Sequence, residues 1–140
     1  MQQSTVTILL ATALLSGCVP YPVYKTLQPA ATATIQDSQG EPIAGAAVTL
    51  ISSAYPYGWE KSRETQFSTE EGVAEFSSQR EWRVEALALH GRELYFWNWC
   101  VEKEGFETFS TALGDAADFQ TEPVVLLEAG QSTPCLEPIR

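Results

Sequence analysis

The chain has few positive charges and a single histidine. Its 140 residues contain eight Lys and Arg against eighteen Asp and Glu, which gives a formal net charge of −10. A protein with this balance is repelled by nucleic-acid phosphates and by anionic lipid headgroups. We therefore exclude nucleic acid as a partner and expect no basic patch that would hold the chain on a membrane. The acidic residues are scattered in ones and twos, as on an ordinary solvated surface.

The sequence also lacks the residue sets that enzymes and metal sites need. His90 stands beside a glycine with no second histidine in the chain, so carboxylates would have to supply any metal site or acid–base pair. The serine pairs at 52–53 and 77–78 have no glycine-flanked elbow. Asp115 and Asp118 are too few acidic ligands for a known calcium loop. We expect no enzyme, no metal and no cofactor.

Long apolar runs are scarce too. The apolar and small residues at 6–15 are too short a run to cross a hydrocarbon core of about 30 Å as a helix, so they predict a signal segment. They lead into Leu15-Ser16-Gly17-Cys18, which resembles the lipobox of bacterial lipoproteins. The resemblance implies that residues 1–17 are a signal peptide and that Cys18 carries the covalent lipid. A secreted protein with a buried cysteine is the alternative.

The residues after Cys18 predict a tether at the outer membrane. Residues 18–30 contain three prolines and no periodicity, so neither a helix nor a strand ladder is expected to continue through them. Val19 is not the aspartate that lipoprotein families associate with inner-membrane retention. The lipobox resemblance therefore implies a protein anchored to the outer membrane by its lipid, facing the periplasm or the cell surface.

The remaining two cysteines form an even pair. If Cys18 is lipidated, Cys100 and Cys135 are left in a compartment where disulfides persist. A bridge between them would close a loop worth roughly 4 kcal/mol on the chain-entropy model. We expect this bridge, with two separate thiols as the alternative.

Alternation with a period of two begins at Ala31, where Ala31, Ala33 and Ile35 alternate with polar residues as in a half-buried strand. A turn glycine at Gly40, a strand at 46–52, a threonine strand at 65–69 and a strand after Gly72 follow. Together with 100–107 and 124–127, these segments resemble a carboxypeptidase regulatory-like domain. That resemblance implies an all-β, antiparallel, transthyretin-like (Ig-like) sandwich of about seven or eight strands. The sandwich is expected over residues 31–128, with a C-terminal tail over 129–140.

The expected core contains Ile35, Val48, Leu50, Phe67 and Phe76, together with several of the tryptophans. Residues 80–98 are longer and more aromatic than a minimal domain of this kind needs. The alternation places Trp82, Val84 and Ala86 on one strand face, and we expect Trp82, Trp97 and Trp99 to be core residues. In the strand near residue 100, Cys100 and Asn98 share the face that carries Glu102. That face is expected to be the outer one, so a bridge from Cys100 to Cys135 would hold the tail across the outside of the sheet.

A cluster of aromatic residues is the main feature of the sequence that suggests binding of a partner or a ligand. Tyr55, Tyr57 and Trp59 are expected in a loop, where they either pack over the open end of the sandwich or form a contact surface. Two functions follow. One is a lipid-anchored, non-catalytic envelope module that binds a protein partner or gives structural support. The other is a small periplasmic module that binds a glycan or another ligand, with Asn98 beside the rings.

Overall fold

The computed structural model describes residues 20–55, 58–86, 92–111 and 119–137. These residues form nine β-strands and no helix, which confirms the predicted β-sandwich. The strand count exceeds the prediction because β1 lies in the segment expected to be a tether and β8 is only two residues long. The strands are β1 (Pro20–Gln28), β2 (Ala31–Asp37), β3 (Ala47–Tyr55), β4 (Trp59–Phe67), β5 (Val73–Phe76), β6 (Gln79–Ala86), β7 (Leu94–Glu102), β8 (Phe109–Ser110) and β9 (Val124–Leu127).

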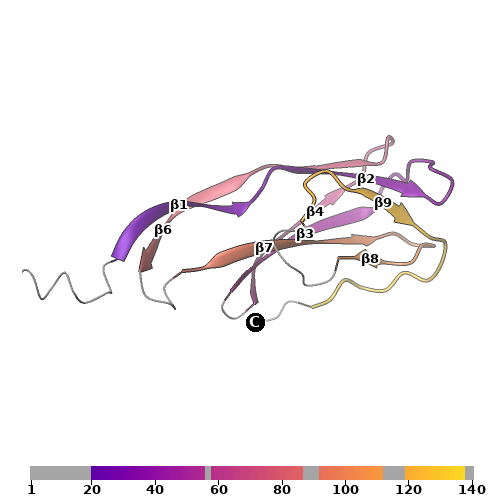
Figure 1. Ribbon diagram of the computed structural model, residues 1–140. Coiled ribbons are helices and arrows are strands. Elements are labelled where there is room, and N and C mark those ends of the chain that lie inside the picture. Colours follow the sequence, from indigo (N-terminus) through magenta and orange to yellow (C-terminus); the bar gives the residue numbers. More distant parts are fainter. Residues whose placement is uncertain (1–19, 56–57, 87–91, 112–118, 138–140) are drawn as a thin grey trace, which may run out of the picture.

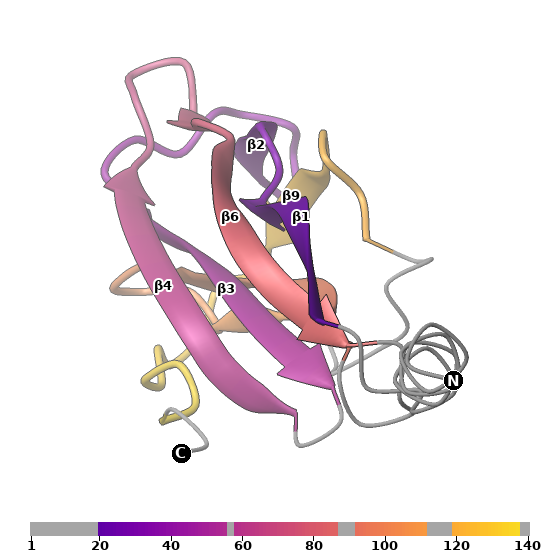
Figure 2. The same cartoon turned by 90° about the vertical axis from the view of Figure 1, so that its left-hand side faces the viewer.

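The strands lie in two layers (Figures 1 and 2). One layer is the four-stranded sheet β4-β3-β7-β8, which we call sheet C. The other consists of the three-stranded sheet β5-β2-β9 and the two-stranded β1-β6 ribbon. The ribbon continues the three-stranded sheet, because β1 leads directly into β2 and β5 leads directly into β6. In Figure 1 the ribbon extends the molecule to the left of the three-stranded sheet.

The segment predicted to be a flexible tether is a strand instead. β1 pairs antiparallel with β6 from Pro20 opposite Ala86 to Gln28 opposite Gln79. Prolines cannot donate to a ladder, but among the described residues β1 has a neighbour on one side only. An edge strand tolerates proline because the missing N–H can face the open side. The prolines therefore mark an edge strand, and the prediction of a tether over residues 18–30 is wrong for residues 20–28.

One strand pair differs from the antiparallel prediction. β2 pairs antiparallel with β5, but its other neighbour, β9, runs parallel to it, with Ile35 opposite Val125 and Asp37 opposite Leu127. The three-stranded sheet is therefore mixed, because β9, the last of the described strands, runs parallel to β2 beside it.

The apolar core lies between sheet C and the three-stranded sheet. Of the predicted core residues, Ile35, Val48, Leu50 and Phe76 are buried, and so is Trp99. Phe67 was predicted to be buried, but 70% of it is exposed. It lies opposite Ala47 and therefore on the outer face of sheet C, two residues from Thr65, whose hydroxyl bonds Thr49. The core is completed by Ala31, Ala33, Ile43, Ala46, Ala74, Val101, Val125 and Leu127.

A glycine brings the turn before β5 against β2. Gly72 has a φ of 74° and its carbonyl accepts a hydrogen bond of 2.7 Å from the Ile35 N–H. A Cβ atom at this position would lie 2.4 Å from the Ile35 carbonyl oxygen. The turn glycine expected from the sequence is thus required both for its backbone conformation and for this close approach.

The C-terminal tail is held on the outside of sheet C. Cys100 of β7 and Cys135 form the predicted disulfide, with Cα atoms 6.1 Å apart. The Cys135 N–H also donates to Glu102 Oε1 at 2.9 Å, and Thr133 and Thr108 exchange two hydrogen bonds. In Figure 1 the tail runs below β7 and β8. The parity argument that placed Cys100 on the outer face is confirmed.

Candidate functional site

The β1-β6 ribbon exposes apolar side chains and turns charged ones inward. Trp82 and Val84 are 70% and 73% exposed, whereas Glu85, between Val84 and Ala86, is only 6% exposed. The sequence correctly placed Trp82, Val84 and Ala86 on one face, but the expectation that Trp82 is a core residue is wrong. We call the outward side of the two strands the ribbon face. Its residues are Pro20, Pro22, Tyr24, Thr26, Arg80, Trp82, Val84 and Ala86.

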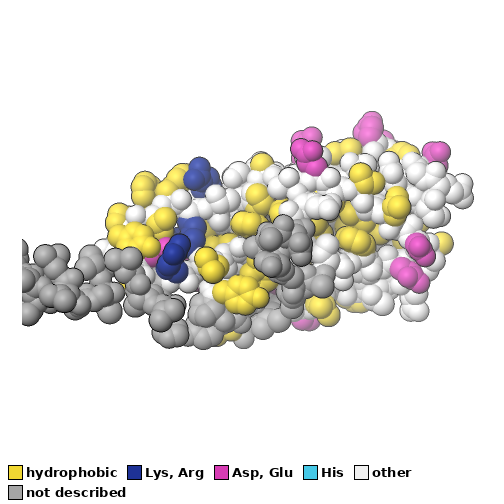
Figure 3. Space-filling model, in the orientation of Figure 1, with side chains coloured by type: hydrophobic (Ala, Val, Ile, Leu, Met, Phe, Trp, Pro, Cys, Tyr) yellow, Lys and Arg dark blue, Asp and Glu magenta, His cyan; other side chains and the backbone are white. Residues whose placement is uncertain are grey.

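Three side chains of the ribbon face contact one another. The rings of Tyr24 and Trp82, which are directly opposite across the two strands, have centroids 5.2 Å apart. The Arg80 guanidinium carbon lies 4.6 Å from the Tyr24 ring centroid, within cation–π range. The result is an aromatic strip with one cation at its end. Figure 3 shows hydrophobic side chains together with Lys and Arg at the end of the molecule where the ribbon lies.

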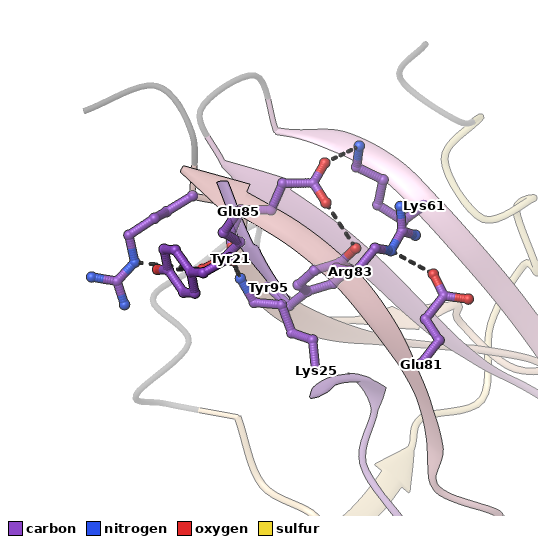
Figure 4. Close-up of polar contacts among 9 residues, drawn as sticks. Tyr21, Lys25, Lys61, Glu81, Arg83, Glu85 and Tyr95 are labelled. Atoms are coloured by element: carbon purple, nitrogen blue, oxygen red, sulfur yellow. Dashed lines mark hydrogen bonds and ion pairs between the residues drawn. The ribbon is translucent and has the colours of Figure 1, made fainter. Parts of the chain in front are cut away.

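The inward side of the ribbon is a polar network, drawn in Figure 4. Lys25 of β1 forms an ion pair with Glu85 of β6 and also donates to the carbonyl of Glu93. The Tyr21 hydroxyl donates to Glu85 at 3.2 Å, and Arg92 Nε lies 3.8 Å from the same carboxylate. Glu85 is therefore buried with its charge compensated from three sides, as a buried carboxylate requires.

The network continues to sheet C through Glu93. The Tyr95 hydroxyl donates to one Glu93 oxygen at 3.1 Å, and Lys61 Nζ donates to the other at 2.7 Å. Lys25 Nζ also lies 5.8 Å from the centroid of the Tyr95 ring. Side chains of β1, β4, β6 and β7 thus join the two layers through charge at this end, whereas apolar contacts join them at the other end.

The pKa values of this network are shifted away from neutral pH. The hydrogen bond from Lys25 lowers the pKa of Glu85, and the hydrogen bond from Lys61 lowers the pKa of Glu93. Burial, with the hydrogen bond to Glu93, raises the pKa of Tyr95 to about 12. A general acid or base works best with a pKa near the operating pH. The arrangement therefore suits a structural role, which is to fasten the ribbon to sheet C.

The predicted aromatic contact surface is divided between two faces. Tyr55 ends β3 and Trp59 begins β4, so both lie in strands and not in the expected loop; Tyr57 lies outside the described residues. Tyr55 is directly opposite Leu94 on the outer face of sheet C, and its ring contacts Phe96 with centroids 5.0 Å apart. Trp59 lies opposite Ala54 and so points to the other face. Tyr55, Trp59 and Leu94 are 52%, 46% and 58% exposed.

A cavity of about 510 Å³ lies on the outer face of sheet C, beside the tail. Its walls include Ile51, Asn98 and Trp99 of the sheet and Leu136 of the tail. Arg63 also lines it and donates to both oxygens of Glu60 at 2.9 and 2.8 Å and to the Leu136 carbonyl at 2.8 Å. Asn98 is 4% exposed, and no hydrogen-bond partner for its Nδ2 is found among the described residues. The sequence had placed Asn98 beside a ligand site, but the cavity itself could not be foreseen because the folded tail forms one wall.

Several predicted positions lie outside the described residues. These are the lipobox with Cys18, His90, and the two aspartates Asp115 and Asp118. Within the described ranges no cluster of three His, Cys, Asp or Glu side chains could hold a metal ion. The same ranges contain no helix of the length and hydropathy that crossing a bilayer requires.

Comparison of the chain with protein-family models, with curated proteins and with solved structures finds no match in any of the three.

Proposed function

We propose that this chain is a lipid-anchored, non-catalytic module of the cell envelope that binds a protein partner through the outer face of sheet C. The lipobox at Leu15-Ser16-Gly17-Cys18 supports the anchor, and the motifs from Gly40 to residue 127 support a carboxypeptidase regulatory-like sandwich. The outer membrane is the proposed location, because the residue after the anchor cysteine is Val19 and not the aspartate that lipoprotein families associate with inner-membrane retention.

The observation that carries the partner-binding proposal is the exposed pair Tyr55 and Leu94. These side chains lie directly opposite each other on the outer face of sheet C, and Phe96 packs behind Tyr55. Both are more than half exposed although they are large and apolar. Leu136 of the tail, 75% exposed, is a further exposed apolar side chain and lines the cavity on this face. Exposed apolar patches backed by packed rings are typical of contact sites in proteins.

Two experiments test this function. Cys18→Ser should abolish incorporation of labelled palmitate and leave the chain in its precursor form. Stable anchoring needs more than one acyl chain, so the mature protein should carry a diacylglycerol and an additional acyl group. A mature terminus other than Cys18, or an unlipidated wild-type chain, would contradict the anchor.

The partner is tested with a photo-crosslinking residue in place of Leu94 in the intact envelope. One discrete adduct is expected, and it should disappear when Tyr55→Ser is added. A crosslinker in place of Glu71, an exposed residue in the turn before β5, serves as the matched control and should give no adduct. Adducts of equal yield from both positions would contradict a contact surface on sheet C.

The cavity beside the tail favours a second function, the binding of a small ligand. Its walls combine the apolar Ile51 and Leu136 with the polar Asn98 and the charged Arg63. A site of this size holds a small molecule, for which Asn98 and Arg63 would fix the orientation. A glycan or other ligand that binds here should bind less tightly to an Asn98→Leu variant, as measured by calorimetry. Unchanged affinity in that variant would rule this site out.

A further inference from the structure

We propose that the ribbon face lies on the surface of the membrane that holds the lipid anchor. The ribbon face would then orient the sandwich on a bilayer, with Trp82, Tyr24 and Val84 in the interface between headgroups and acyl chains. This inference rests on the proposed lipid at Cys18 and adds a second, non-covalent contact to it.

The first argument is the reversed polarity of the ribbon. A strand that covers one side of a sandwich in water normally turns apolar residues inward and polar residues outward. In β6 the opposite holds, because Glu85 is buried in an ion network while Trp82 and Val84, on the opposite face of the strand, are at least 70% exposed. The inward Glu85 carboxylate is paired with Lys25, accepts a hydrogen bond from Tyr21 and lies 3.8 Å from Arg92 Nε. Exposing the outward apolar side chains to water is unfavourable, so the ribbon face would be stabilised by contact with an apolar environment.

The second argument is the chemistry of the ribbon face. Trp and Tyr are enriched at membrane–water interfaces because their rings combine an apolar body with a polar edge. Arg80, stacked against Tyr24, can extend its guanidinium to lipid phosphates while its stem stays on apolar surface. Among the described residues of this face there is no carboxylate. A phospholipid surface matches this chemistry, because its acyl boundary accepts the aromatic rings and its phosphates accept the one cation.

The third argument is the distance to the anchor. β1 begins at Pro20, two residues after Cys18. Two residues span at most about 7 Å even when fully extended. Since β1 is a strand of the sandwich and not a tether, lipidation of Cys18 would bring the start of the ribbon face to the bilayer surface. No long linker separates the two.

The fourth argument is the distribution of charge. The net charge of −10 belongs to the whole chain, but the acidic residues are not spread evenly. Figure 3 shows Asp and Glu toward the end opposite the ribbon. That end carries Asp37 at the end of β2, Glu41 after it, and Glu70 and Glu71 in the turn before β5. An anionic membrane would repel this end and leave the ribbon end in contact, which fixes one orientation.

The test uses the mature, lipidated chain in vesicles of phosphatidylethanolamine and phosphatidylglycerol, with and without brominated acyl chains. Bromine quenches tryptophans that reach the acyl region, so the wild-type emission should fall in the brominated vesicles. Trp82→Phe should remove this quenching, whereas Trp59→Phe should retain it. Lipid on Cys18 is measured in the same sample by mass spectrometry.

A second pair of variants separates contact from folding. Val84→Glu adds a carboxylate to the ribbon face and should abolish the quenching without changing the melting temperature. Leu126→Glu, at a position on β9 that is 56% exposed in the same layer, is the matched control and should leave the quenching unchanged.

The outcomes distinguish this inference from the proposed function. A lipidated wild-type chain whose emission is the same in both kinds of vesicle overturns the inference and leaves the anchor standing. An unlipidated chain overturns the anchor, and the inference falls with it. A wild-type dimer in detergent that Val84→Glu converts to a monomer assigns the ribbon face to a second copy of the chain and also overturns the inference.

Discussion

Phe76 of β5 meets Trp99 of β7 edge to face across the two layers, with ring centroids 5.4 Å apart. Both residues are at least 96% buried, and the Trp99 indole N–H donates to the Gln120 carbonyl at 3.0 Å. Such a contact between a buried phenylalanine and a buried tryptophan is worth more than the apolar area it removes from water.

The first prediction concerns this contact. Phe76→Ala should lower the free energy of unfolding by about 3–5 kcal/mol, because it leaves a cavity beside Trp99. Phe67→Ala is the matched control, since 70% of Phe67 is exposed. The control should change the free energy by no more than about 0.5 kcal/mol. Urea denaturation followed by circular dichroism measures both values, and equal losses in the two variants would contradict the described core.

The second prediction concerns the bridge between Cys100 and Cys135, which closes a 35-residue separation in the sequence. Removing it should destabilise the chain by up to about 4 kcal/mol, because the unfolded chain regains the entropy of an open loop. The tail then has only hydrogen bonds to hold it, while the β-sheet signal in circular dichroism should persist. Mass spectrometry of non-reduced peptides should show the crosslink. A melting temperature unaffected by reduction would contradict a stabilising role of the bridge.

The third prediction is a loss of stability in acid that depends on Glu85. The ion pair with Lys25 lowers the pKa of Glu85 below its ordinary value. The folded state therefore binds this proton less readily than the unfolded chain does, and the stabilisation is present above the unfolded pKa of about 4.3. It is lost as the pH falls through the lower folded pKa. Melting temperatures measured from pH 7 to pH 3 should fall less steeply for Glu85→Gln than for the wild type.

A control for this experiment is Glu71→Gln, which replaces an exposed carboxylate in a turn. Its melting temperature should follow the wild-type curve. Parallel curves for Glu85→Gln and the wild type would mean that the ion network does not contribute to acid sensitivity.

The fourth prediction is a loss of stability in alkali that depends on Tyr95. Burial raises its pKa from 10.0 to about 12. The folded state therefore retains this proton after the unfolded chain has released it. The stabilisation is fully present below pH 10 and is lost as the pH rises toward 12. In Tyr95→Phe the melting temperature should fall less steeply between pH 10 and pH 12 than in the wild type. Ultraviolet titration should show one tyrosine that ionises at higher pH than the others in the native protein and not in the unfolded one.

The sequence predicted individual strands well where the alternation was regular. The alternation from Ala31 to Ile35 matches the buried positions of β2, and the strands that the family resemblance implied after Gly72 and at 124–127 match β5 and β9. The disulfide was also predicted, from the even cysteine pair that lipidation of Cys18 would leave in an oxidising compartment, and the parity of β7 placed Cys100 on the outer face. These features depend on local pattern, which a single sequence records.

The features that were missed depend on strand pairing. Prolines argued against a strand at 20–28, and only the neighbour β6 shows that β1 is an edge strand. The alternation around Trp82 grouped these residues correctly but assigned their face to the core, because the partners of Glu85 come from β1 and from Arg92. A buried carboxylate becomes acceptable only once Lys25 and Tyr21 are beside it. The position of Phe67 likewise follows from its pairing with Ala47.

The parallel pair of β2 and β9 bears on the order in which the chain folds. β9 is among the last described segments to be synthesised, yet Val125 and Leu127 complete the core beside Ile35. Until residue 127 is available, β2 has β5 as its only ladder partner among the described strands, and its other edge is open. Contacts between residues this far apart in sequence form slowly, because a long loop must close first. The sandwich therefore closes after synthesis of the chain has passed its last strand, and chains truncated before Val124 carry an open strand edge of the kind that aggregates.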